Sequence, residues 1–218
     1  MYDAIQERIA AYDQEIQRKL AEMGQQNPPE GPAPELKNPE KAKAIKKRGE
    51  EPMRQALYQM AGVDLASIDA IGVETIQIVL SEYGPDLSCF PTEKQFVSHA
   101  TLAPHKPTSG GKPLKKKKRN SASIRVSAAL RMAALSQRHS QTALGAYYRN
   151  IARRKDGGVA VFATARKLAT HIYRLLRWGQ PYVDEAAKAY EDQYRERSVK
   201  SLIAKAKQFG YQLTPVTA

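Results

Sequence analysis

Apolar residues recur at intervals of three and four along most of the chain, which is the spacing of one face of an α-helix. The clearest stripe opens the sequence and consists of Ile5, Ile9, Tyr12, Ile16, Leu20 and Met23. It predicts a coiled-coil helix over residues 3–23, with Gly24 as its C-cap. A helix this short is marginal in water, so it needs a partner. That partner is a second copy, a missing part of the chain, or the following domain.

A proline-rich stretch interrupts this pattern. Residues 25–39 contain five prolines, which favour extended backbone and exclude a helix. We therefore expect a coiled-coil helix at 1–24, a linker at 25–39 and a C-terminal domain at 40–218. Within this domain, residues 40–61 are weakly helical, with a break near Gly49.

The next apolar positions predict two short helices within residues 64–84, joined by a tight turn at Ala70–Val73. Asp64 is placed to cap the first helix, and Gly84 ends the second. A further short helix is expected over 93–101, and a long loop over 104–123. Four helices then follow at 123–138, 141–155, 158–178 and 183–209. No strand-like alternation is evident, so the predicted fold class is all-α.

The positive charge is concentrated in one segment. The chain has 35 Lys and Arg against 22 Asp and Glu, a net charge of +13. Residues 94–155 hold 15 of the basic residues and no acidic one, so the rest of the chain is slightly acidic. A charge gathered in this way indicates a polyanionic partner such as a nucleic acid, bound with a steep salt dependence.

Two segments offer chemistry to such a partner. The turn before the second short helix resembles a helix-hairpin-helix (about 65–83), whose N–H groups at Gly72 and Val73 would meet DNA phosphates; a plain helical hairpin is the alternative. The loop at 104–123 carries Ser109 between small residues, where a phosphodiester can approach the backbone. Ser109 is the candidate nucleophile, with His99 and His105 as the nearest imidazoles; an ordinary Ser/Gly loop is the alternative.

The remaining candidates for DNA binding flank these segments. They are Gly110, Gly111, Lys112, Lys115, Lys116, Lys117, Lys118, Arg119, Arg125 and Arg131. The basic run suits a phosphate clamp beside the serine, or else a solvated segment. Tyr147 and Tyr148 lie among further arginines and would stack on bases, although helix packing is expected for at least one of them.

Several classes are disfavoured. The single cysteine, Cys89, cannot form an internal disulfide and suits the cytoplasm. Neither a signal peptide nor a membrane-spanning run is visible, so no membrane partner is expected. Metal-ligand clusters and a P-loop are also missing, which predicts no cofactor in this chain. His171 and Arg174 resemble the tyrosine-recombinase pattern, but Tyr182 follows too closely, so His171 is expected to be a surface or packing residue.

Four segments together resemble the C-terminal half of a bacterial transposase family, the RNA-guided DEDD/serine transposases of the insertion-sequence family numbered one hundred and ten. They are Ile68–Gly84 (IDAIGVETIQIVLSEYG), Phe90–Gly111 (FPTEKQFVSHATLAPHKPTSGG), Ile124–Ala134 (IRVSAALRMAA) and Ala143–Tyr182. The likeness runs from about residue 60 to the C-terminus. Their combination is specific, whereas each segment alone is weak.

The resemblance implies that Ser109 attacks a DNA phosphodiester and holds the strand as a phosphoserine. It also implies a structured guide RNA, a synaptic multimer, and an N-terminal domain in which four acids bind divalent metal such as Mg²⁺. A coiled coil joins the two parts, which suggests a homo-oligomer formed through residues 1–24.

The sequence departs from that family at several points. The four-acid domain is missing, Ala70 stands where the hairpin has glycine, and Ile124 stands where many members have asparagine. We therefore expect the chain alone to be inactive, as a truncated or degraded element. A non-catalytic DNA- or RNA-binding module is the main alternative, and a coiled-coil interaction protein with incidental charge is a third.

Overall fold

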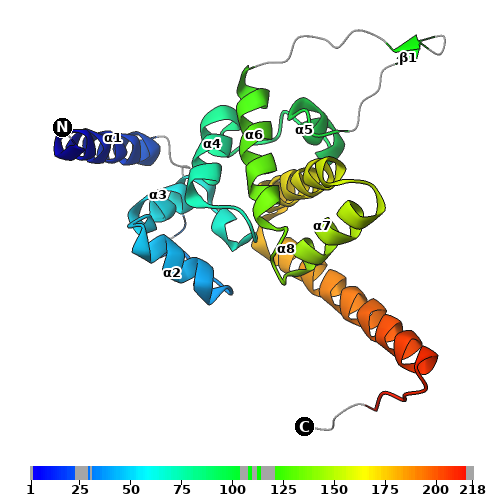
Figure 1. Ribbon diagram of the computed structural model, residues 1–218. Helices are drawn as coiled ribbons and strands as arrows, with labels where there is room; N and C mark the ends of the chain where they lie inside the picture. Colours follow the sequence, from blue (N-terminus) through cyan, green and yellow to red (C-terminus); the bar gives the residue numbers. More distant parts are fainter. Residues whose placement is uncertain are drawn as a thin grey trace.

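The computed structural model describes residues 2–22, 29, 31–103, 108–109, 112–113 and 121–214, and over these residues the protein is all-α, as predicted (Figure 1). The only strands in the described ranges are two residues long. One contiguous cluster of buried apolar side chains runs from Ile45 to Leu175. None of the helices in these ranges is both long and apolar enough to span a membrane.

The N-terminal helix is confirmed as α1 (Tyr2–Glu22), and it packs against α3. Among the side chains of the apolar stripe that the structure describes, Ile16 packs against the core. By contrast, Ile5 and Ile9 are about half exposed. The first half of the stripe is thus not covered by the body of the chain. The predicted C-cap Gly24 lies outside the described residues.

The end of the proline-rich segment is extended and leads into α2 (Pro39–Lys47), which Asn38 caps through its side chain. The expected break follows at Gly49, where φ is +67°, a value that suits glycine. The next helix, α3 (Glu51–Ala61), ends at Gly62 in the left-handed region.

The predicted pair of short helices is present in modified form. Asp64 does cap the first element, but this element is a single 3₁₀ turn, η1 (Leu65–Ser67), because Ile68 is already extended. The second, α4 (Val73–Tyr83), stops at Gly84 as expected. The short helix α5 (Glu93–His99) begins with a capping box between Thr92 and Gln95.

The remaining helices form the body of the fold. They are α6 (Ser121–Ser136), α7 (Ala143–Arg154) and α8 (Gly157–Gln208). The sequence predicted two helices over the range of α8. The backbone does leave helical geometry between them, at Gly179, where φ is +79°. The part of α8 before Gly179 packs against α5, α6 and α7, while the end of α8 projects from the bundle (Figure 1).

Candidate nucleic-acid interface

A tight turn leads into α4, where the hairpin was predicted. The N–H of Ile71 donates to the carbonyl of Ile68 at 3.3 Å, which closes a four-residue turn. The third residue of this turn, Ala70, has φ +70°. A positive φ at this position is typical of a type II turn and normally requires glycine. The structure therefore holds an alanine in a backbone conformation that costs it about 1 kcal/mol.

The start of α4 is open. Gly72 is the N-cap and has no side chain to satisfy the first N–H groups of the helix. A Cβ added at Gly72 would meet no atom within 4 Å. Val73 is buried and anchors the first turn to the core. The first N–H groups of α4 thus have no side-chain cap, an arrangement that can bind an anion, whereas the exposed carboxylate of Glu74 in the same turn opposes one.

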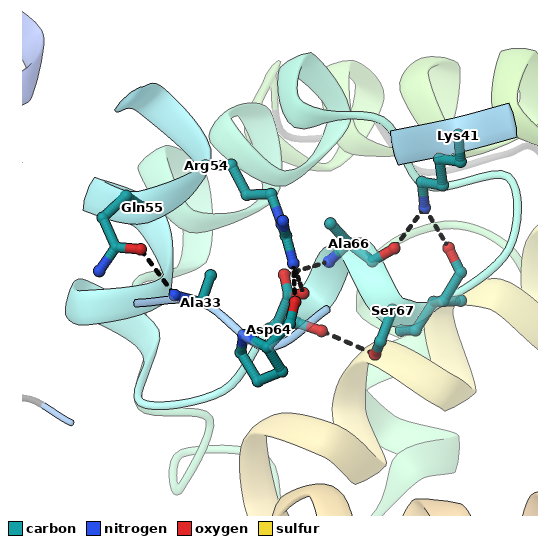
Figure 2. Close-up of polar contacts among 9 residues, drawn as sticks. Ala33, Lys41, Arg54, Gln55, Asp64, Ala66 and Ser67 are labelled. Atoms are coloured by element: carbon teal, nitrogen blue, oxygen red, sulfur yellow. Dashed lines mark hydrogen bonds and ion pairs between the residues drawn. The ribbon is translucent and has the colours of Figure 1, made fainter. Parts of the chain in front are cut away.

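Charged side chains from α2 and α3 contact the segment that leads into the turn Ile68–Ile71 (Figure 2). The carboxylate of Asp64, which is 5% exposed, lies 2.5 Å from the guanidinium of Arg54 and accepts the N–H of Ala66 at 3.0 Å. The ammonium of Lys41 donates to the carbonyls of Ala66 at 2.5 Å and Ile68 at 2.8 Å. Burial lowers the pKa of Lys41 to about 8; the nearby Asp69 and Asp64 oppose this shift, and Arg54 adds to it.

The predicted serine loop contains a small antiparallel pair of strands, β1 (Thr108–Ser109) and β2 (Lys112–Pro113). The register places Ser109 opposite Lys112. The predicted DNA-binding residues Gly110, Gly111, Lys115, Lys116, Lys117, Lys118 and Arg119, and His105, lie outside the described part of the chain. The roles of Ser109 and its neighbours therefore stay predictions.

Two polar pairs lie where the chain enters and leaves this loop. The hydroxyl of Tyr83 lies 3.2 Å from Nδ1 of His99, at the end of α5. Burial, and then the charge of Glu82, raises the pKa of Tyr83 to about 12, so the hydroxyl stays protonated. Arg125, near the start of α6, reaches Glu82 at 2.5 Å. His99 is exposed, and its ring contacts the neutral hydroxyl of Tyr83. Arg125 is paired with the carboxylate of Glu82.

Other arginines of the basic segment also contact protein groups. The guanidinium of Arg131 lies 5.2 Å from the centre of the Phe162 ring, and its Nε donates to the carbonyl of Ser127. Arg149 donates to the carbonyl of Ser140 before α7. The exposed cations of the segment, within the described ranges, include Lys94, Arg138, Arg153, Arg154 and Lys155. Part of the positive charge therefore stabilises helix packing as well.

Three of the predicted site residues lie at the two ends of α4. Gly72 and Val73 lie at its first turn, whereas Arg125 meets Glu82 in its last turn. Ten residues of helix separate these positions by about 15 Å. An extended polymer such as a nucleic-acid strand can contact both ends of α4, whereas a small ligand cannot.

The two tyrosines of α7 differ in burial. Tyr148 is buried, which confirms the expectation that at least one of them packs in the helical core. Tyr147 is partly exposed, and the ammonium of Lys167 lies 4.5 Å from the centre of its ring. Tyr147 is therefore the tyrosine that remains a candidate for stacking on bases.

His171 packs within the body of the fold. Burial lowers its pKa to about 4, and the charges of Lys167 and Arg174 act in the same direction. The imidazole is therefore neutral near pH 7, which suits a packing residue. Arg174 lies 2.8 Å from the carboxylate of Glu93, so it joins α8 to α5. In the described part of the chain, no three His, Cys, Asp or Glu side chains gather as a metal site.

Comparison with known proteins supports a transposase-like protein. A protein-family model described as "Transposase IS116/IS110/IS902 family" matches residues 63–149. The match contains the turn before α4, the serine loop, α6 and part of α7. No curated protein and no solved structure shows significant similarity to the chain. The family match supports a function in transposition and an interaction with DNA.

Sequence reasoning missed the residues that support the turn. Lys41 and Arg54 come from α2 and α3, both outside the matched segment. Little in the sequence indicated a role for Lys41, because a lysine in a charged helix is usually solvated. A pairing of Arg54 with Asp64 could have been suspected, because Arg54 lies on the helix just before this capping residue.

Proposed function

We propose that this chain is the serine-bearing, DNA-binding part of a DNA transposase and acts together with a metal-binding domain of the kind that the family resemblance implies. The observation that carries the proposal is the family match over residues 63–149, because it includes both Ser109 and the turn before α4. The open N-terminus of α4 and the cluster of basic residues support it.

In the proposed reaction, the Ser109 hydroxyl attacks the phosphorus of a DNA phosphodiester. A base takes the hydroxyl proton, the bond from phosphorus to one deoxyribose oxygen breaks, and that oxygen is protonated as it leaves. The new phosphodiester joins Ser109 to the strand and conserves the bond, so no ATP is needed. The reverse attack by another strand end completes the exchange and frees the serine.

The family resemblance implies a domain in which four acids bind a divalent metal. A metal such as Mg²⁺ would there stabilise charge on the phosphate. Within this chain, the first N–H groups of α4 hold a phosphate of the duplex, and Lys112 and the lysines of 115–118 neutralise charge beside Ser109. A structured guide RNA and homo-oligomerisation through α1 complete the proposal.

A non-catalytic DNA- or RNA-binding module is the second candidate. Ala70 favours it, because the turn before α4 holds an alanine where φ is +70°. The two candidates share nucleic-acid binding and differ in whether Ser109 becomes linked to DNA.

Duplex binding tests the part that both candidates share. We expect the full chain to bind a short DNA duplex at low salt, with affinity that falls steeply as salt rises, because counterions are released from neutralised phosphates. Replacing Lys115, Lys116, Lys117 and Lys118 with glutamine should reduce the slope of log affinity against log salt by about 0.9 for each lost phosphate contact. Fluorescence anisotropy over a series of salt concentrations measures this slope.

The matched control replaces four exposed lysines elsewhere, Lys43, Lys46, Lys205 and Lys207, with glutamine. It lowers the net charge equally and should leave most of the slope intact. Equal losses in the two quadruple variants would show that the charge acts diffusely and would contradict a clamp at 115–118. Absence of duplex binding by the unmodified chain at low salt would overturn the proposal.

A further inference from the structure

A lysine outside the family-matched segment contacts the turn that leads into α4. Lys41 lies on α2, and its ammonium donates to the carbonyls of Ala66 and Ile68 (Figure 2). The carbonyl of Ile68 also accepts the N–H of Ile71, which closes the turn. Lys41 therefore binds the first residue of the turn directly.

The turn needs this support because its backbone is unfavourable. Ala70 has φ +70°, and an alanine leaves that region readily unless its surroundings hold it there. If the turn relaxed, Gly72 and the first N–H groups of α4 would change direction, because only one residue separates Ala70 from the N-cap.

Further contacts hold the same turn to the N-terminal segment. Arg54 joins Asp64, which caps η1, to the carbonyl of Pro34 at 2.5 Å. Gln55 accepts the N–H of Ala33 at 2.7 Å. Hydrogen bonds thus connect Pro34, through Arg54 and Asp64, with Ala66, which Lys41 also binds. The segment before the matched region is therefore part of the support of the turn.

We propose that Lys41 is a positioning residue for DNA binding: its ammonium holds the turn Ile68–Ile71 so that the first N–H groups of α4 face a phosphate. This inference rests on the proposed function for its DNA step, whereas the effect on the turn can be measured without DNA. The charged groups around the ammonium are Asp69 and Asp64, which attract it, and Arg54, which opposes it.

The test compares Lys41→Met with Lys43→Met. Both changes remove one positive charge from α2, but Lys43 is exposed and pairs with Glu40, which is also exposed, at 3.4 Å. We expect Lys41→Met to speed amide hydrogen exchange at Ile71 and in the first turn of α4, and to weaken duplex binding about tenfold, the effect of losing one charged hydrogen bond. Lys43→Met should change exchange there little and binding by less than about threefold.

A double variant separates positioning from charge. Lys41 also attracts Asp69, the second residue of the turn, so its loss leaves the negative charge of Asp69 less compensated and more repulsive to DNA. If charge alone matters, Lys41→Met combined with Asp69→Asn restores the affinity of the unmodified chain, and the proposal is wrong. If Lys41 positions the turn, the double variant stays weak and its exchange at the first turn of α4 stays fast.

Folding is checked by circular dichroism before each measurement. If Lys41→Met does not fold, Lys41→Gln takes its place, because it removes the ammonium but keeps a polar side chain. Unchanged exchange at Ile71 in the variant that folds overturns the inference. If the unmodified chain does not bind DNA, the proposed function fails, but hydrogen exchange still decides whether Lys41 holds the turn.

Discussion

Replacing Asp64 with alanine is expected to lower the free energy of unfolding by about 3–5 kcal/mol, since removing one member of a buried ion pair leaves the other charge unpaired. The side chain of Arg54 is only 14% exposed and would remain without its carboxylate. The change also removes the cap of η1, because the N–H of Ala66 loses its acceptor. Urea unfolding followed by circular dichroism measures the effect.

The control for Asp64→Ala is Glu40→Ala. Glu40 pairs with Lys43 at 3.4 Å, and both side chains are at least three-quarters exposed. An exposed pair of this kind contributes at most about 1 kcal/mol, so this variant should remain close to the unmodified chain. If Asp64→Ala were as stable as Glu40→Ala, the buried pair would not support the turn before α4.

Gly145→Ala is expected to be the second most damaging change, at about 2–3 kcal/mol, as is usual when a methyl group is forced into a packed site. A Cβ at Gly145 would lie 2.2 Å from the carbonyl oxygen of Ser140 and 3.0 Å from that of Gln137. Both are backbone atoms, so relief requires the α6–α7 connection to move. Arg149 donates to the same Ser140 carbonyl, so the shift would also weaken that contact.

Gly157→Ala provides the matched control for Gly145→Ala. Gly157 also stands in the first turn of a helix, but a Cβ there would meet nothing within 4 Å. Alanine at this position should be neutral or stabilise by up to about 1 kcal/mol, because it restricts the unfolded chain more than glycine does. Thermal unfolding of the two variants distinguishes a close contact at Gly145 from a general intolerance of alanine.

Helices were predictable wherever the apolar spacing was long and its ends were marked by particular residues. Gly49, Gly84 and Gly179 each take positive φ at the break that the sequence indicated. Asp64 was correctly predicted to be a cap. The helix that follows it was predicted too long, because η1 ends after one turn, where the backbone of Ile68 is extended. Tertiary packing, which local spacing cannot reveal, decides such short elements.

The candidate site was harder to predict because basic side chains can either bind nucleic acid or stabilise the packing of the protein itself. A run of basic residues suggests nucleic acid, yet Arg131 lies over Phe162 and Arg149 holds a backbone carbonyl. Sequence alone does not distinguish such arginines from those that face a phosphate. The contribution of Lys41 was invisible for a related reason, since its acceptors are backbone carbonyls 25 and 27 residues away.

The separation of the predicted site residues along α4 has a functional consequence. The proposed phosphate contact at Gly72 lies at the first turn of α4, whereas Arg125 and His99 contact Glu82 and Tyr83 in its last turn. The rigidity of α4, whose Ile76, Val79 and Leu80 are buried, would keep the two contacts in register.

Covalent capture of DNA tests the central claim most directly. The full chain is mixed with a separately supplied four-acid metal-binding domain of the same transposase type, Mg²⁺, guide RNA and labelled DNA, and then denatured and digested for mass spectrometry. We expect a nucleotide-linked peptide containing Ser109, absent when the second domain is omitted and absent from Ser109→Ala. Full capture by Ser109→Ala, or linkage at another residue, would contradict the assignment of Ser109 as the nucleophile.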